Sequence, residues 1–231
     1  MTRHRRAPAL PLALALALAL ALLAPAAAAA QVGHAPAKSP YRDIKQGGSI
    51  TLHGGRFLGN GGDAAVGPND GWSFGGRFDF RSGRALALGL GVSYAPLERL
   101  IVDPFVDEVT GPVDQSVAFA EAHITLNLTG GKTWNGFAPF VGLAGGFGFG
   151  SKVPADTSGY DFGTKFFFAP AAGTRVFFGD RVHVRAEFRA NFWKLTYPLS
   201  FRQEPDPVII TGANSEWDLS PWVLVGIGYT L

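Results

Sequence analysis

Residues 181–193, RVHVRAEFRANFW, decide the fold because their side chains alternate with a period of two. The even positions from Val182 to Phe192 are apolar, whereas the odd positions from His183 to Asn191 are polar or charged. This period is that of a β-strand whose two faces lie in different surroundings. In a soluble barrel the apolar face lines the interior, whereas in a membrane-spanning barrel it faces lipid and the polar face lines the lumen. Other parts of the sequence distinguish the two cases.

Residues 1–30 have the three parts of a secretory signal peptide. The basic stretch TRHRR is followed by the apolar ALPLALALALALALLAP and by the small-residue tract AAAAA. This order predicts cleavage after Ala30 and export of the mature chain. The alternative of an uncleaved membrane helix is disfavoured by the proline and alanines that follow the apolar run. We expect residues 31–46 to form a polar lead-in in the periplasm and residues 47–231 to form the folded domain.

The composition excludes several classes of protein. The chain has no Cys, so the exported domain has to be held together by strand pairing and burial instead of disulfides. Beyond residue 30, no apolar run approaches the roughly 20 residues that a membrane-spanning helix needs. Several of the 20 Lys and Arg residues lie in the signal peptide, so we infer no nucleic-acid partner. The sequence also predicts no cofactor and no metal site.

Eight segments have the pattern of β-strands. They lie at about residues 48–58, 71–81, 85–95, 116–129, 137–150, 164–178, 182–195 and 217–231. Each is at least as long as the roughly 9 to 11 residues that cross a bilayer at a tilt. Short and long connections alternate, as in transmembrane barrels with short periplasmic turns and long outer loops. The sequence therefore predicts an all-β fold, an eight-stranded antiparallel up-and-down transmembrane β-barrel.

Charged residues on the predicted inner face meet small residues on the facing strands, which suits the narrow interior of an eight-stranded barrel. The expected pairs are Arg77 with Gly89, Asp79 with Ala87, Glu121 with Ala144, His123 with Gly142, Glu187 with Gly173 and Arg189 with Ala171. We interpret the inner polar residues as a buried ion-pair network that fills the lumen, because each buried charge needs a partner. Its candidate members are Arg77, Asp79, Arg81, Glu121, His123, Arg175, His183, Arg185, Glu187, Arg189 and Asp218.

Aromatic residues near the strand ends next to the long loops favour lipid outside the barrel. Trp72, Tyr94, Phe192, Trp193 and Trp217 have the positions expected of interfacial aromatics. They argue against a soluble exported ligand-binding barrel, which would be apolar inside and polar outside.

The last residues, WVLVGIGYTL, resemble the signal that outer-membrane barrels present to the barrel-assembly machinery, here through Gly226, Tyr229 and Leu231. Together with APFVGLAGGFGFG and FFGDRVHVRAEFR, they make the chain similar to the OmpA-like and OmpX-like outer-membrane β-barrel domain family. This resemblance implies a monomer in the outer membrane of a Gram-negative cell, in contact with membrane lipid and lipopolysaccharide.

We expect a small barrel without enzymatic activity, with a plugged polar lumen and a structural or interaction role for its surface loops. One alternative is a narrow channel or a conduit for small apolar molecules. A further alternative is a lipid-modifying enzyme, because the resemblance admits lipid A deacylases, which carry a His-x-Ser pair. His123 and His183 are followed two positions later by Thr125 and Arg185, so neither offers the serine.

Overall fold

The computed structural model describes residues 39–45, 47–103, 108–202 and 214–231. The predicted signal peptide lies outside the described residues, and so does the predicted lead-in up to residue 38 and at residue 46. The barrel belongs to the compact unit Pro40–Leu231. Among the described residues, no helix is long and apolar enough to cross a membrane.

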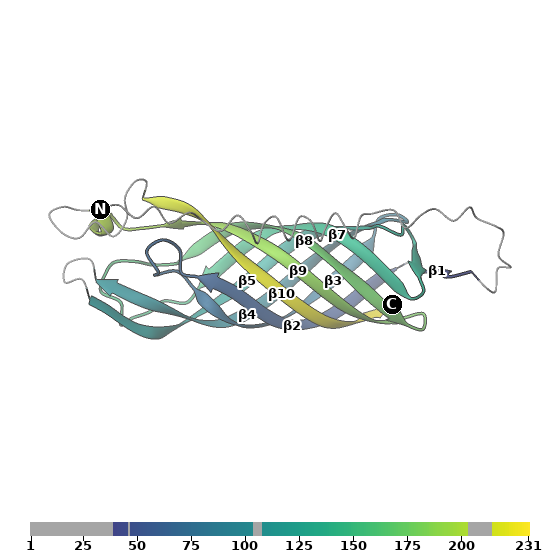
Figure 1. Ribbon diagram of the computed structural model, residues 1–231, viewed down its shortest axis with the longest axis horizontal. Helices are drawn as coiled ribbons and strands as arrows, with labels where there is room; N and C mark the ends of the chain where they lie inside the picture. The colour runs from purple at the N-terminus through teal and green to yellow at the C-terminus, as the bar shows by residue number, and fades with distance from the viewer. Residues whose placement is uncertain (1–38, 46, 104–107, 203–213) are drawn as a thin grey trace, which may run out of the picture. The chain divides into compact units, whose positions relative to one another are not determined.

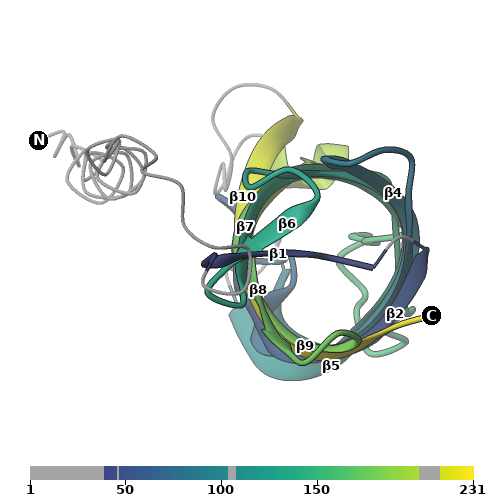
Figure 2. The ribbon, with the colours of Figure 1, turned by 90° about the vertical axis from the view of Figure 1, so that its right-hand side faces the viewer.

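Eight long strands form the wall of the barrel (Figures 1 and 2). They are β2 (Gly48–Asn60), β3 (Asn69–Arg81), β4 (Leu86–Asp103), β5 (Glu108–Asn127), β7 (Phe137–Gly150), β8 (Thr164–Phe178), β9 (Val182–Thr196) and β10 (Ser215–Thr230). The order around the sheet is β7-β5-β4-β3-β2-β10-β9-β8, and pairing of β7 with β8 closes it. Each long strand pairs antiparallel with its neighbours along the chain, and β10 pairs with β2. The predicted fold class is confirmed.

The outward surface of the barrel is apolar. Leu52, Leu90 and Ile227 are 69%, 65% and 66% exposed, whereas the alternating inward positions, such as Thr51 and Arg77, are buried. A continuous exposed apolar surface of this kind is unfavourable in water and suits lipid. A soluble barrel would need polar side chains outside and apolar side chains inside, so its faces would be reversed relative to this structure.

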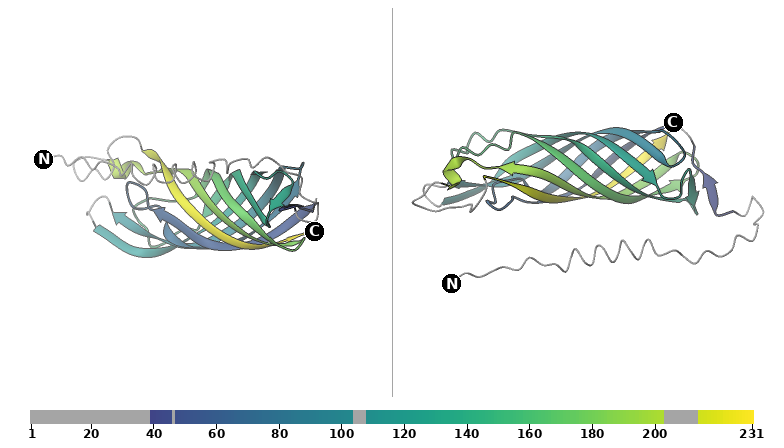
Figure 3. Two further views of the ribbon diagram at one scale, coloured as in Figure 1. Left: turned by 45° about the vertical axis from the view of Figure 1, so that its right-hand side comes forward. Right: turned by 90° about the horizontal axis from the view of Figure 1, so that it is seen from above.

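The connections divide the barrel into a turn end and a loop end (Figures 1 and 3). The turn end holds the connections β3–β4, β5–β7 and β8–β9, together with the end of β10. The loop end holds the connections β2–β3, β4–β5, β7–β8 and β9–β10, the last of which begins with the 3-10 helix η2 (Leu199–Arg202).

Two short strands at the turn end are not predicted from the sequence pattern. β1 (Tyr41–Asp43) pairs with β6 (Lys132–Trp134), which lies in the connection between β5 and β7. Figure 2 shows β1 crossing the opening of the barrel. The next residue, Ile44, is 3% exposed, and its N–H donates to the Gly131 carbonyl at 2.9 Å. Residues 40–45, the β1 strap, therefore cover the turn end, whereas the sequence predicts a simple polar lead-in.

Two of the three predicted strand registers are wrong by two residues. Asp79 faces Gly89 instead of Ala87, and Glu121 faces Gly146 instead of Ala144. The β3–β4 turn is wider than three residues, since β4 begins only at Leu86, and the Ser82 N–H donates to the Leu86 carbonyl at 3.0 Å. The predicted β8–β9 register is confirmed, with Gly173 opposite Glu187. A shift of two preserves the faces, because the side-chain period of a strand is two.

The hairpin of β4 and β5 is longer than predicted. The sequence interpretation places a loop between residues 95 and 116, whereas the ladder continues to the pair Asp103 and Glu108. Pro96 suggests a loop, but the β3–β4 ladder ends at Phe74 opposite Tyr94, so this part of β4 has an edge on which proline is tolerated. The extension carries buried Arg99 above the barrel wall.

Candidate functional site in the barrel lumen

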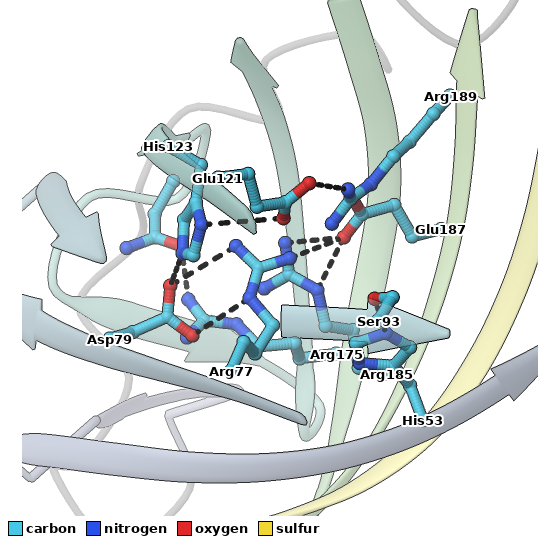
Figure 4. A network of polar contacts seen from close by, with 11 residues as sticks. His53, Arg77, Asp79, Ser93, Glu121, His123, Arg175, Arg185, Glu187 and Arg189 are labelled. Atoms are coloured by element: carbon cyan, nitrogen blue, oxygen red, sulfur yellow. Dashed lines mark hydrogen bonds and ion pairs between the residues drawn. The ribbon is translucent and has the colours of Figure 1, made fainter. Parts of the chain in front are cut away.

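Glu187, on β9, is the centre of an ion-pair network inside the barrel (Figure 4). Its carboxylate lies 3.0 Å from Arg77 Nη1 and 2.5 Å from Arg185 Nη2, and it also accepts a hydrogen bond from Arg189 Nε. All four side chains are buried. Three guanidinium groups thus share one carboxylate away from water, and its removal would leave the buried Arg185 without an ion-pair partner.

Two further carboxylates extend the network across the lumen. Glu121 Oε2 lies 2.6 Å from Arg189 Nη1, and Asp79 Oδ2 lies 3.2 Å from Arg77 Nε. His123 joins them, with Nε2 at 2.8 Å from Asp79 Oδ1 and Nδ1 at 3.7 Å from Glu121 Oε1. The structure therefore brings together Arg77, Asp79, Glu121, His123, Arg185, Glu187 and Arg189.

Glycines on the intervening strand make these contacts across strands possible. Gly89 lies between Asp79 and His123 in the ladders of β3, β4 and β5. A Cβ added at Gly89 would lie 2.2 Å from His123 Nε2, so any side chain there would displace the imidazole. Gly91 lies in the same way between Arg77 and Glu121. The sequence predicts that a large inner residue faces a small one on the next strand. In the structure, two large residues on outer strands meet over a glycine on the strand between them.

Four predicted members lie outside this network. Arg81 donates to the Ile44 carbonyl at 3.3 Å, and Arg175 donates to Asn127 Oδ1. The ring of His183 packs on Phe177, with 5.0 Å between centroids, and Asp218 accepts from Trp193 Nε1 at 2.9 Å. Their positions along the strands explain the difference: Arg81 is the last residue of β3 at the turn end, whereas Asp218 lies near the loop end of β10.

His53 and Ser93 are inner residues that the sequence interpretation misses. His53 Nε2 lies 3.0 Å from Ser93 Oγ. The alternation of Ile50 and Leu52 with Thr51 in β2 was the signal that places His53 on the inner face. A small cavity beside it, with room for roughly one water molecule, is lined by His53, Arg77, Arg185, Glu187, Arg189, Leu224 and Gly226.

The half of the lumen nearer the loop end is aromatic. Ring centroids lie 5.4 Å apart for Phe57 and Trp193, and 4.9 Å apart for Phe119 and Trp222. These four residues, with Phe162 and Phe167, are the aromatic cluster, and each is at most 3% exposed. The prediction that Trp193 is an interfacial aromatic is therefore wrong. Trp193 and Arg189 both occupy odd positions of β9. The period of two therefore places both side chains inside the barrel, however close Trp193 lies to the loops.

An ion pair holds the β7–β8 connection, residues 151–163, in the mouth of the barrel. Arg99 Nη2 lies 2.6 Å from Asp156 Oδ2, with both side chains 1% exposed, and this pair is the latch. The Arg99 guanidinium lies 5.0 Å from the Tyr160 ring centroid. Burial opposes ionisation of Asp156, but hydrogen bonds from Ser158 and Arg99 outweigh it and lower the pKa of Asp156. The ionised pair therefore fixes a connection whose Tyr160 and Phe162 are buried.

The comparisons with known proteins support the fold. No protein-family model and no curated protein matches the sequence. The outer membrane protein OprG of Pseudomonas aeruginosa superposes with a TM-score of 0.53 at 13% identity, covering 82% of this chain and 98% of OprG. The chain has the fold of an outer-membrane β-barrel. Neisserial surface protein A is also similar, with a TM-score of 0.49 at 13% identity over 84% of this chain and 98% of its own.

In an outer-membrane barrel the turn end is periplasmic and the loop end faces outward. Trp72, Tyr94 and Trp217 point out of the wall and are 58%, 50% and 58% exposed, and Phe192 stacks on Phe168 at 5.1 Å between centroids. Their interfacial role stays a prediction.

The three residues of the predicted assembly signal lie on the last strand and just beyond it. Gly226 faces the lumen, whereas Tyr229 and Leu231 are exposed. The Tyr229 hydroxyl accepts from Arg181 Nη1 at 3.0 Å. Whether the assembly machinery binds these residues stays a prediction. Among the described residues, no group of three His, Asp or Glu side chains is arranged to hold a metal ion.

Proposed function

We propose that this protein is a monomeric, non-enzymatic outer-membrane barrel with a plugged lumen, which serves the membrane structurally and presents its loops to the outside. The observation that carries this proposal is that buried groups lie at three successive levels of the lumen. The β1 strap covers the periplasmic opening, the ion-pair network occupies the middle, and the aromatic cluster and the latched β7–β8 connection occupy the outer half. A closed sheet also lacks the free edges through which strands associate.

The size of the barrel supports a plug over a pore. The interior of eight strands is just wide enough for side chains. The cavity beside His53 has room for roughly one water molecule and does not constitute a channel.

Conductance in a planar bilayer tests the plug. The purified full chain should give no steady conductance above that of a protein-free bilayer. Stable, ion-selective currents from the unmodified protein would contradict the plug and favour the narrow channel.

The position of the Ser–His pair supports the absence of catalysis. Within the described residues, His53 has no hydrogen-bonded carboxylate, and the pair with Ser93 points into the lumen beside Arg77 and Glu187. A lipid outside the wall cannot reach a nucleophile placed there. We therefore do not propose a lipid-modifying enzyme.

A conduit for small apolar molecules is the second candidate, and the aromatic cluster is the observation that favours it. Uptake of an apolar fluorescent dye into proteoliposomes separates the two candidates. The plug predicts the uptake rate of protein-free liposomes, and a faster rate would favour the conduit.

Outer-membrane lipid and lipopolysaccharide are the surroundings that we propose for the outward face. Lys194 points outward at the loop end of β9, opposite exposed Trp217. A cation beside an aromatic ring at this level suits the anionic headgroup region above the apolar belt.

A further inference from the structure

The charges inside the barrel do not balance. In the middle and the periplasmic half of the lumen, five guanidinium groups, those of Arg77, Arg81, Arg175, Arg185 and Arg189, accompany three carboxylates, those of Asp79, Glu121 and Glu187. The excess is 5 − 3, or two positive charges. Arg81 is only half-buried at the end of the barrel, where water can reach it. The other excess charge belongs to Arg175, which is 4% exposed.

Arg175 has a neutral polar partner. Its Nη2 donates to Asn127 Oδ1, and its guanidinium lies 5.7 Å from the Phe177 ring centroid. Within the described part of the chain, no carboxylate lies at ion-pair distance from Arg175. The carboxylates of the ion-pair network pair with other groups, namely Arg77, Arg185, Arg189 and His123. A buried charge without a counter-charge is unfavourable, and an arginine side chain cannot become neutral by losing its proton.

Hydrogen-bond donors around Arg175 also lack acceptors. Among the described residues, the donors Arg175 Nε and Asn127 Nδ2 are buried without a hydrogen-bond partner. The His183 ring packs on Phe177, with 5.0 Å between ring centroids. Buried donors almost always have an acceptor, which can be a bound ion.

We propose that Arg175 and Asn127, with His183 nearby, bind one small monovalent anion of the size of chloride in the periplasmic half of the lumen. Water could accept the free hydrogen bonds, but it would leave the guanidinium charge uncompensated in a medium of low dielectric constant. The near-complete burial of Arg175 excludes a large anion. The site goes beyond the proposed function, and it does not depend on whether the lumen conducts.

Thermal unfolding of the full mature chain tests the site. Melting is followed by tryptophan emission in sodium chloride and in sodium gluconate of equal ionic strength, since gluconate is too large to enter. At about 100-fold excess of chloride over its dissociation constant, we expect the melting temperature to be roughly 5 to 10 °C higher in chloride. Equal melting temperatures in the two salts would mean that water alone fills the site, and would overturn the proposal.

Two variants locate the effect. Arg175→Gln should lose the difference between the two salts, whereas Arg84→Gln, which removes one charge from the exposed β3–β4 turn, should keep it. A difference that persists in Arg175→Gln would place the anion elsewhere and overturn the assignment. If Arg175→Gln does not fold, chloride NMR of the unmodified protein decides: we expect line broadening that bromide reverses, and the absence of broadening would overturn the site.

Discussion

At the scale of single residues, Phe188 tests which face of β9 meets lipid. It is 50% exposed between Glu187 and Arg189, both of which are buried. We expect Phe188→Arg to lower the free energy of unfolding in lipid vesicles by about 2 to 4 kcal/mol, because a guanidinium near the bilayer midplane loses its hydration. Urea titration measures the change, with Phe188→Leu as the control that keeps an apolar group. Equal stability of the two variants would contradict the assignment of the faces.

At the scale of elements, the latch determines whether the β7–β8 connection stays in the barrel mouth. Asp156→Asn removes one charge of a pair whose side chains are both 1% exposed and leaves Arg99 without a counter-charge, which typically costs about 3 to 5 kcal/mol. We expect faster cleavage by trypsin at exposed Lys152, which mass spectrometry would follow. Asp161→Asn, at an exposed position of the same connection, should cleave like the unmodified protein. Equal rates in all three proteins would show that the latch does not hold the connection.

The same latch has a predictable dependence on pH. Because the folded protein lowers the pKa of Asp156, the stability that it contributes is present above the ordinary carboxyl pKa of about 3.9. This contribution is lost as the pH falls through the lowered value. The latch should therefore stay closed at neutral pH and open only in strong acid. An acid-active protease tests this pH dependence. The rate of cleavage near Lys152 is compared between the unmodified protein and Asp156→Asn at one pH above and one pH below the lowered pKa of Asp156. A difference in rate that is the same at both pH values would contradict the prediction.

At the scale of the whole molecule, the end of β10 serves both closure and, as we predict, assembly. The Thr230 N–H donates to the Arg181 carbonyl and the Leu231 N–H to the Gly48 carbonyl, each at 2.8 Å. Deleting Thr230 and Leu231 should lower the amount of folded protein in the outer membrane far more than its synthesis. Refolding of the purified variant in detergent separates the two roles: normal refolding with poor assembly in cells indicates a lost signal. Unchanged assembly would refute the predicted signal.

The sequence by itself determined the eight long strands and their faces, because alternation with period two is a local property of each strand. RVHVRAEFRANFW assigns Arg185, Glu187 and Arg189 to one face and Phe188 to the other without any knowledge of partners. The same rule, applied strictly, would have placed Trp193 inside; proximity to a loop was the weaker criterion.

Tertiary structure alone decided which charged inner residues form ion pairs. Register depends on the width of each turn, and neither the two-residue shifts at Asp79 and Glu121 nor the strap at Ile44 has a local signature. The contact between Asp79 and His123 requires three strands in register with Gly89 between them. The isolation of Arg175 from every described carboxylate likewise follows from the positions of other side chains around the closed barrel, because ion pairing is set by distances in space that the order of residues does not contain.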